Sequence, residues 1–193
     1  MALRQSAFTQ LETDRLILRR FADSDLPAIF AYRNDCEVAK YQSWTATGEA
    51  ELRAFIHDLK TASPGTPGEW FQFAIESKAM KELIGDCALK VNKEDICQGE
   101  IGFTLARRHQ GRGFATEAVS MLLDYAFTKL GLHRVIAITD CDNRASIVLL
   151  ERLDMRREGR FLQSVCDKGE WRDEYSYAII KEEWFRRPKS QNR

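Results

Sequence analysis

Several signatures of membrane, metal and disulfide proteins are missing from this sequence of 193 residues. No hydrophobic run is long enough for a membrane span or for the core of a signal peptide. The five cysteines (36, 87, 97, 141 and 166) are scattered, with no C-x-x-C pair and no histidine cluster at zinc-ligand spacing. We therefore expect a cytoplasmic protein with reduced thiols, no membrane association and no metal.

An excess of charge of one sign is also absent, because 29 basic residues balance 29 acidic ones. Proteins that bind nucleic acid without sequence preference usually carry net positive charge, so direct nucleic-acid binding is not expected. The sequence contains no G-x-S-x-G motif and only three histidines, which argues against serine-hydrolase chemistry.

The length fits one domain, and no repeat or low-complexity linker divides the chain. The loop-rich stretch SPGTPG at 63–68 is typical of an internal surface turn. We expect residues 1–10 to be an N-terminal extension, 11–185 to form the domain, and 186–193 to be a basic, disordered tail.

Hydrophobic periodicity predicts seven strands and four helices. Strands are expected at 14–21, 70–76, 82–91, 99–106, 133–140, 155–163 and 171–180. Four helices are expected, at about 24–33, 49–59, 115–130 and 144–153. Ser24 is expected to cap the first helix, and Gly131 is expected to end the third. The third helix is the clearest, because its apolar residues form one stripe: Ala115, Ala118, Val119, Leu122, Leu123, Ala126, Phe127 and Leu130.

This order of elements predicts an α+β (mixed α/β) fold. An antiparallel meander leads into a β–α–β–α–β stretch, and the last two strands form a hairpin. Helical crossovers make neighbouring strands parallel, whereas short turns make them antiparallel. We therefore expect a mixed, mostly antiparallel central sheet flanked by helices.

The stretch RRHQGRGFATEA at 107–118 places two glycines and three arginines directly before the clearest helix. The first N–H groups of a helix lack internal partners and lie at the positive end of its dipole. Glycines allow a ligand to approach the backbone closely, so this turn predicts an anion site suited to a diphosphate. A glycine-rich helix entry without a ligand is the alternative.

Two nucleotide motifs fit this turn poorly. A Walker loop ends in G-K-[ST], but Phe114 and Ala115 follow the glycines. A dinucleotide fingerprint needs a third glycine where Thr116 stands, although Asp140 at the end of the next strand resembles the ribose-binding acid. A dinucleotide-binding oxidoreductase is therefore only a minor alternative.

The residues from Arg108 to Gly113 resemble the R/Q-x-x-G-x-G/A signature of the GCN5-related N-acetyltransferases (GNAT family). The stretches GEIGFTL, DNRASIVLLERLDMRREG and WRDEYSYAIIKEEW are also similar to family segments, in the family's order. Together with LETDRLILRRFADSDLPAIFAYRND, they resemble the ribosomal-protein N-terminal (RimJ/RimL-like) acetyltransferase subgroup over about residues 11–184.

The resemblance implies an enzyme that moves an acetyl group from acetyl-CoA directly to a primary amine, either a protein N-terminal amine or a small amine. A CoA-binding regulatory module without catalysis is the main alternative. Members of the family often form dimers, so the resemblance leaves a homodimer as one expectation for the oligomeric state.

The resemblance also implies which residues hold the cofactor. The pyrophosphate would lie on the turn that contains Arg108, Gln110, Gly111, Arg112, Gly113, Phe114 and Ala115. The pantetheine arm would meet backbone groups of Phe103, Thr104 and Leu105 and the side chains of Asn143 and Ser146. Asn143 would alternatively cap the following helix.

Glu100 in GEIGF resembles the family's catalytic glutamate and is the candidate general base. The alternative is that Glu100 is an ordinary surface acid of a strand. Asp140 is a weaker candidate for the base. Ser146 or solvent would protonate the thiolate, because no tyrosine lies between 141 and 155. Asp154 departs from the usual glycine, but aspartate tolerates a left-handed turn. Four aromatic residues would either line the acceptor pocket or pack in the core. They are Tyr41, Trp44, Trp70 and Phe71.

Overall fold

The computed structural model describes residues 8–42, 44 and 48–187, and the ends of the predicted extension and tail lie outside these residues. The described strands form one sheet in the order β1-β2-β3-β4-β5-β6-β8-β7. Their bounds are β1 (Gln10–Glu12), β2 (Leu16–Arg19), β3 (Trp70–Ser77), β4 (Glu82–Val91), β5 (Gln98–Leu105), β6 (Arg134–Asp140), β7 (Arg156–Asp167) and β8 (Glu170–Ile180).

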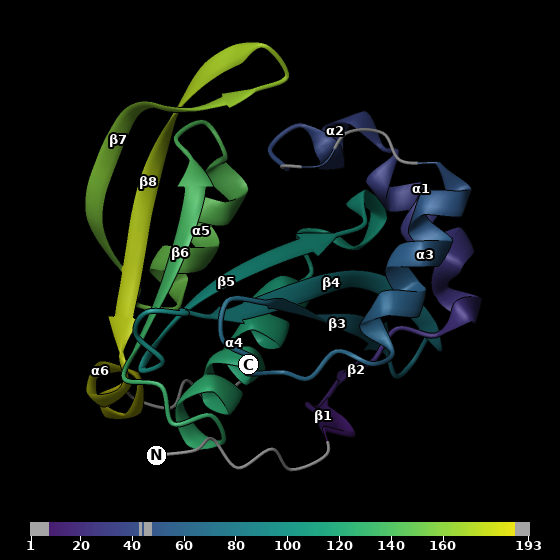
Figure 1. Cartoon of the computed structure of the whole chain (residues 1–193), viewed down its shortest axis with the longest axis horizontal. Helices are drawn as coiled ribbons and strands as arrows, with labels where there is room; N and C mark the ends of the chain where they lie inside the picture. The colour runs from purple at the N-terminus through teal and green to yellow at the C-terminus, as the bar shows by residue number, and fades with distance from the viewer. Residues whose placement is uncertain (1–7, 43, 45–47, 188–193) are drawn as a thin grey trace.

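Helices cover both faces of this sheet (Figure 1). Helices α1 (Leu26–Arg33) and α3 (Glu49–Leu59) pack on one face in a cluster that includes Ala74 and Leu83 of the strands. Helices α4 (Phe114–Thr128) and α5 (Arg144–Arg152) pack on the other face, in the larger core. The remaining described helices are the short α2 (Cys36–Ala39) and α6 (Lys181–Arg186). No described helix combines the length and apolar composition that a membrane crossing needs.

The predicted fold class is confirmed. The strands β1 to β5 form an antiparallel meander, and β7 and β8 form the predicted hairpin, with β8 inserted beside β6. Strands β5 and β6 are parallel, because α4 carries the chain back across the sheet between them. A doubly wound parallel sheet, which the dinucleotide alternative requires, is not the architecture of the described residues.

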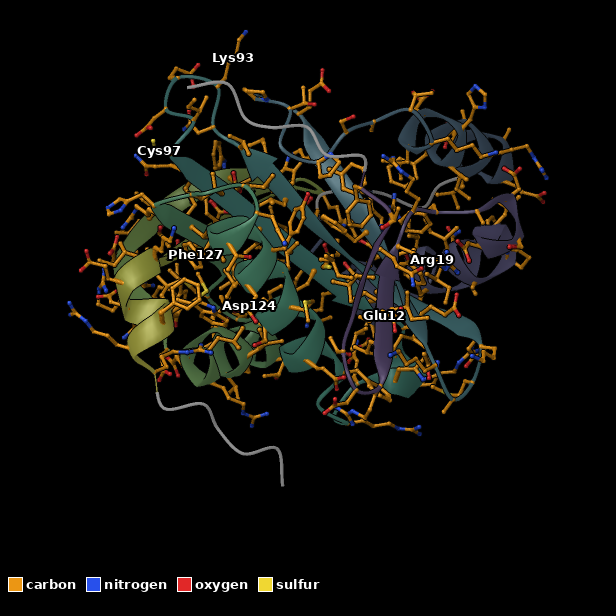
Figure 2. All side chains as sticks on the ribbon, turned by 90° about the horizontal axis from the view of Figure 1, so that it is seen from below. Glu12, Arg19, Lys93, Cys97, Asp124 and Phe127 are labelled. Atoms are coloured by element: carbon orange, nitrogen blue, oxygen red, sulfur yellow. The ribbon has the colours of Figure 1, made fainter. Side chains whose placement is uncertain are left out.

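Helix α4 is the central packing element of the larger core. The predicted apolar stripe is confirmed, since Ala118, Val119, Leu122, Leu123, Ala126 and Phe127 are fully buried. Beyond this stripe, Asp124 accepts a hydrogen bond of 2.6 Å from the indole of Trp184 in α6. Figure 2 labels Asp124 and Phe127 on α4. Gly131 has a φ of 72° but lies beyond the end of the helix at Thr128, so it turns the chain after the helix rather than ending it.

Ser24 was expected to cap the first helix, and this prediction was wrong. Residues Asp23–Asp25 form a single 3-10 turn, and α1 begins only at Leu26, followed by Pro27. The proline cannot donate a backbone hydrogen bond and is favoured in the first helical turn, which explains the later start. The short β1, α2 and α6 carry too few residues to show a hydrophobic period.

A buried polar group anchors α1 to the sheet. The hydroxyl of Tyr32 donates to the carboxylate of Asp86 on β4, and burial raises the pKa of both groups. Next to it, the buried guanidinium of Arg33 lies 4.6 Å from the ring of Trp44 and 4.4 Å from that of Phe55. These contacts fix the segment that leads from α1 into α2 and Tyr41.

We expect Gly85→Ala to destabilise the fold, because a Cβ at Gly85 would lie 2.2 Å from the carbonyl oxygen of Thr104 in β5. Backbone cannot yield as a side-chain tip does, so the free energy of unfolding should fall by about 2 kcal/mol or more. Gly102→Ala is the control, since its Cβ would meet nothing within 4 Å. Chemical denaturation measures both, and equal effects of the two substitutions would contradict this account.

Candidate functional site

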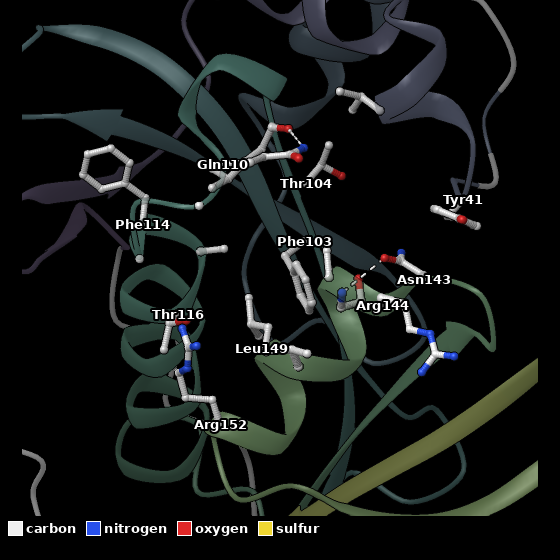
Figure 3. A pocket seen from close by; sticks show the side chains of 18 of the residues that line it. Tyr41, Phe103, Thr104, Gln110, Phe114, Thr116, Asn143, Arg144, Leu149 and Arg152 are labelled. Atoms are coloured by element: carbon white, nitrogen blue, oxygen red, sulfur yellow. Dashed lines mark hydrogen bonds between the residues drawn. The ribbon is translucent and has the colours of Figure 1, made fainter.

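Two cavities meet where β5 and β6 separate. The first has a volume of about 610 Å³ and lies between the α4 turn, β5 and α5. The second has a volume of about 460 Å³ and lies between β5, β6 and the β7–β8 hairpin. Five residues line both cavities: Tyr41, Gln42, Phe103, Asn143 and Ser146. Molecules in the two cavities would therefore touch at this shared end. Figure 3 shows three residues of this end, Tyr41, Phe103 and Asn143, where they line the first cavity.

The separation of the strands leaves backbone groups unpaired. Strand β5 pairs with β6 only through Gln98, Glu100 and the residue between them. Ala106 N donates to Ile84 O on β4 at 2.9 Å, so the alternation of a strand directs the backbone of Phe103 and Leu105 toward the gap. By the same alternation the backbone of Thr104 faces β4, and its side chain lies at the first cavity.

The glycine turn forms one wall of the first cavity. Gly111 and Gly113 have φ angles of 72° and 78°, which glycine adopts without strain. A Cβ at Gly111 would meet nothing within 4 Å, so the backbone there is open to a ligand. The Gln110 side chain donates to Leu105 O at 3.0 Å and ties the turn to the end of β5. Phe114 and Ala115 begin α4 and also line the cavity.

Glu117 holds this turn in place from the first turn of α4. Its carboxylate accepts hydrogen bonds from Thr13 Oγ1 at 2.5 Å, from Arg15 N at 2.9 Å and from Arg15 Nε at 2.6 Å. Partial burial raises the pKa of Glu117, but these hydrogen bonds outweigh it and lower the pKa below its ordinary value. Arg15 also donates to Arg112 O at 3.0 Å, so the β1–β2 turn supports the glycine turn directly.

His109 and Arg108 support the turn from its other side. The His109 ring is buried, and burial together with Arg108 lowers its pKa, so it is neutral at neutral pH. Its Nε2 accepts from Arg108 Nε at 2.9 Å, and Arg108 pairs with Glu82 at 3.2 Å. Neither Arg108 nor Arg112 lines the first cavity, although Arg112 stands between two glycines that do.

Helix α5 forms the opposite wall. The side chain of Asn143 accepts from Ser146 N at 3.1 Å, so Asn143 caps the helix as one of the two predicted roles requires. Asn143 and Ser146 both lie at the shared end of the two cavities. After the helix, Asp154 adopts a φ of 58°, which is the left-handed turn predicted for it.

Glu100 lies in the second cavity and not in the first. Its carboxylate is 3.1 Å from Lys90 Nζ, and Lys90 in turn lies 4.8 Å from the ring of Trp70. Asp140 lines the same cavity, where it accepts from Asp142 N at 2.7 Å and lies 3.8 Å from Arg172. Both predicted carboxylates are therefore in the second cavity.

The segment after α2 crosses the opening and contacts the far side. Tyr41 Oη donates to Asp142 O at 3.3 Å. Lys168, at the tip of the β7–β8 hairpin, donates to Ala39 O at 2.6 Å and to Gln42 O at 3.2 Å. Of the predicted aromatic group, Tyr41 and Trp70 line the second cavity, Phe71 is buried in the core and Trp44 packs on Arg33.

Several lining residues carried no signal in the sequence. The β7–β8 hairpin contributes Asp167, Arg172 and Glu174 to the second cavity, and α5 contributes Arg144 and Arg152 to the first. The alternation of side chains along a strand could have predicted that Asp167, Arg172 and Glu174 share one face of the hairpin. It could not have predicted that this face lies over β6. Within the described residues, no group of three or more His, Cys, Asp or Glu side chains is arranged to hold a metal ion.

The acetyltransferase (GNAT) domain model matches residues 15–156. The chain belongs to the GNAT acetyltransferase family. It is 35% identical to the uncharacterized N-acetyltransferase p20 of Bacillus licheniformis over 90% of this chain and 97% of the relative. It is 28% identical to spermidine N(1)-acetyltransferase of Vibrio cholerae over 90% of this chain and 97% of that relative. A GNAT-family acetyltransferase structure from Bacillus anthracis superposes with a TM-score of 0.80 at 31% identity, covering 91% of this chain and 100% of that one.

Membership confirms the predicted family and the predicted enzyme class, an N-acetyltransferase that depends on acetyl-CoA. The fold that binds acetyl-CoA in this family is the one described above. The roles of individual residues stay predictions, and they are argued below from the geometry.

We expect Gly113→Ala to weaken the binding of coenzyme A. Alanine in the left-handed region costs about 1–2 kcal/mol, which the turn would relieve by moving its amides, so affinity should fall on the order of tenfold. Gly131→Ala is the matched control, because its φ of 72° imposes similar strain beyond the far end of α4. Calorimetry should show weaker binding for the first variant only, and unchanged affinity in Gly113→Ala would contradict a binding role for the turn.

Proposed function

We propose that this chain transfers an acetyl group from acetyl-CoA directly to a primary amine, either a protein N-terminal amine or a small amine. The observation that carries this proposal is the meeting of the two cavities at Phe103, Asn143 and Ser146. Direct transfer requires both substrates to be held in contact, and this shared end provides for it.

The first cavity fits the chemistry of coenzyme A. Its walls combine the backbone of Gly111 and Gly113, the start of α4, and the backbone groups of Phe103 and Leu105 that face the gap, of which Leu105 O already accepts from Gln110. Backbone N–H groups at a helix start suit a diphosphate, and those at a strand edge suit the amides of a pantetheine arm. Acetyl-CoA supplies the activated acyl group as a thioester. We assign Gln110, Phe114, Ala115 and Thr104 to the same binding wall. We assign Arg108 and Arg112, which do not line the cavity, to the glycine turn that forms this wall.

The second cavity fits an amine. Its lining contains four carboxylates, Glu100, Asp140, Asp167 and Glu174, and one guanidinium, Arg172. Among the described residues no Lys or Arg forms an ion pair with Glu174, whose carboxylate accepts a hydrogen bond of 2.8 Å from Ser164 Oγ. A primary amine is a cation near neutral pH and must lose a proton before attack, so carboxylates both attract it and provide a base.

Glu100 is the assigned general base, and Ser146 is the assigned donor at the leaving sulfur. Glu100 lines the acceptor cavity at the last residue of β5 that pairs with β6, directly before the gap, whereas Asp140 lies at the far end of β6. Ser146 stands at the end shared with the cofactor cavity, where its hydroxyl is able to donate to a thiolate. A backbone N–H near Leu105 would stabilise the thioester oxygen as it becomes negative.

A CoA-binding module without catalysis is the second candidate. The observation that favours it is the ion pair between Glu100 and Lys90 at 3.1 Å, which occupies the assigned base. This alternative predicts intact cofactor binding and no acetylated product.

Incubation of the purified protein with acetyl-CoA and a mixed panel of peptides, polyamines and small amines tests the proposal. We expect one class of amine to gain an acetyl group in the mass spectrum, together with release of an equal amount of free thiol. Thiol release that does not depend on the amine, or binding of the cofactor without any product, would contradict it.

We expect Glu100→Gln to lower kcat about a hundredfold, because the amide cannot accept the proton that the attacking amine must lose. The dissociation constant of coenzyme A should not change, since Glu100 lies outside the first cavity. Glu182→Gln on the exposed α6 is the control for the loss of one surface charge. A pH–rate profile completes the test, and a variant with wild-type kcat and an unaltered profile would remove Glu100 from the mechanism.

A further inference from the structure

Four described arginines differ from the rest in having no partner. Arg107, Arg112, Arg144 and Arg152 make no ion pair, side-chain hydrogen bond or ring contact within the described residues. Every other arginine in the described part has a side-chain contact of one of three kinds. Some pair with a carboxylate, as Arg134 does, and some donate to a carbonyl or amide oxygen, as Arg20 does. Others pack over an aromatic ring, as Arg157 does. Unpartnered guanidinium groups keep all their donors available for a ligand.

Two of these four arginines line the first cavity, and the other two belong to the turn that forms one of its walls. Arg144 and Arg152 line the cavity, Arg112 stands between two lining glycines, and Arg107 begins the 3-10 turn just before them. Glu37 is the one carboxylate among the lining residues. The positive charge is therefore not neutralised within the protein, and it suits a ligand with several phosphates.

The position of Arg152 along the cavity distinguishes it from the other three. Residues at the start of α5, Asn143 and Ser146, lie at the end shared with the acceptor cavity. Arg152 is eight residues beyond Arg144, which is about 12 Å along the axis of a helix. Figure 3 shows Arg152 and Thr116 at one end of the cavity, with Asn143 and Tyr41 at the other.

This order along the cavity assigns the two ends of the cofactor. The thioester belongs at the shared end, and the diphosphate belongs at the start of α4. The adenosine portion then extends past the diphosphate to the end of the cavity that Thr116 and the free guanidinium of Arg152 line. Coenzyme A carries a third phosphate there, on the 3′ oxygen of its ribose.

We propose that Arg152 binds the 3′-phosphate of coenzyme A and makes the cavity prefer coenzyme A to the analogue that lacks this phosphate. The inference rests on the proposed use of acetyl-CoA by this cavity. The guanidinium donates two parallel hydrogen bonds to phosphate oxygens, a geometry that a lysine or a glutamine cannot reproduce.

Calorimetric titration of coenzyme A and of 3′-dephospho-coenzyme A tests the assignment in the wild-type protein, in Arg152→Gln and in Arg144→Gln. We expect the wild-type protein to bind coenzyme A on the order of fivefold more tightly than the dephosphorylated analogue. Arg152→Gln should weaken binding of coenzyme A by the same factor and leave binding of the analogue unchanged. Arg144→Gln, on the same helix and cavity wall, should keep the wild-type ratio.

Salt provides an independent readout, because an exposed ion pair is screened. The preference should shrink as sodium chloride rises from about 0.05 M to about 0.5 M, and it should shrink only in proteins that keep Arg152. Equal affinity of the wild-type protein for the two ligands would overturn the assignment while leaving the proposed function intact. An equal loss for both ligands in Arg152→Gln would also overturn it. Failure of both ligands to bind the wild-type protein would remove the proposed function as well.

Discussion

The early separation of two parallel strands is the constraint on which the site depends. Strands β5 and β6 pair only near their start, and β5 then continues beside β4 to Leu105 while β6 continues beside β8 to Asp140. Unpaired backbone groups are costly when buried, so a gap of this kind persists only where something satisfies them. The gap joins two cavities, and its exposed backbone is a ready strand edge for an extended ligand that carries amides.

The elements around the gap are each held by contacts with neighbouring elements. Glu117 ties the glycine turn to the β1–β2 turn, and Gln110 ties it to the end of β5. Elsewhere, Tyr32 and Asp86 anchor α1 to β4, and Lys168 joins the β7–β8 hairpin to the end of α2 and the segment that follows it. A site built from loops thereby gains the fixed geometry that positioning of two substrates requires.

The sequence predicted those parts that depend on local pattern. The apolar stripe predicted helix α4, and Gly111 and Gly113, which have positive φ angles, predicted the turn before it. Both signals arise within a few residues of the chain, so they can be recognised without knowledge of the fold. The hairpin of β7 and β8 was also recognisable from two adjacent strands. Ser24 misled because a hydroxyl before an apolar run is a good cap in general, whereas Pro27 decided where this helix begins. Arg152 and Glu174 could not be assigned to cavities from the sequence, because their positions depend on how α5 and β8 pack against distant strands.

A structure of the protein with bound acetyl-CoA measures the central claim directly. The account predicts the diphosphate on the backbone amides between Gly111 and Ala115, and the thioester in the gap beside Phe103, facing the cavity that contains Glu100. A diphosphate bound elsewhere, or an acyl group directed away from the second cavity, would contradict the assignment of the two cavities to the two substrates.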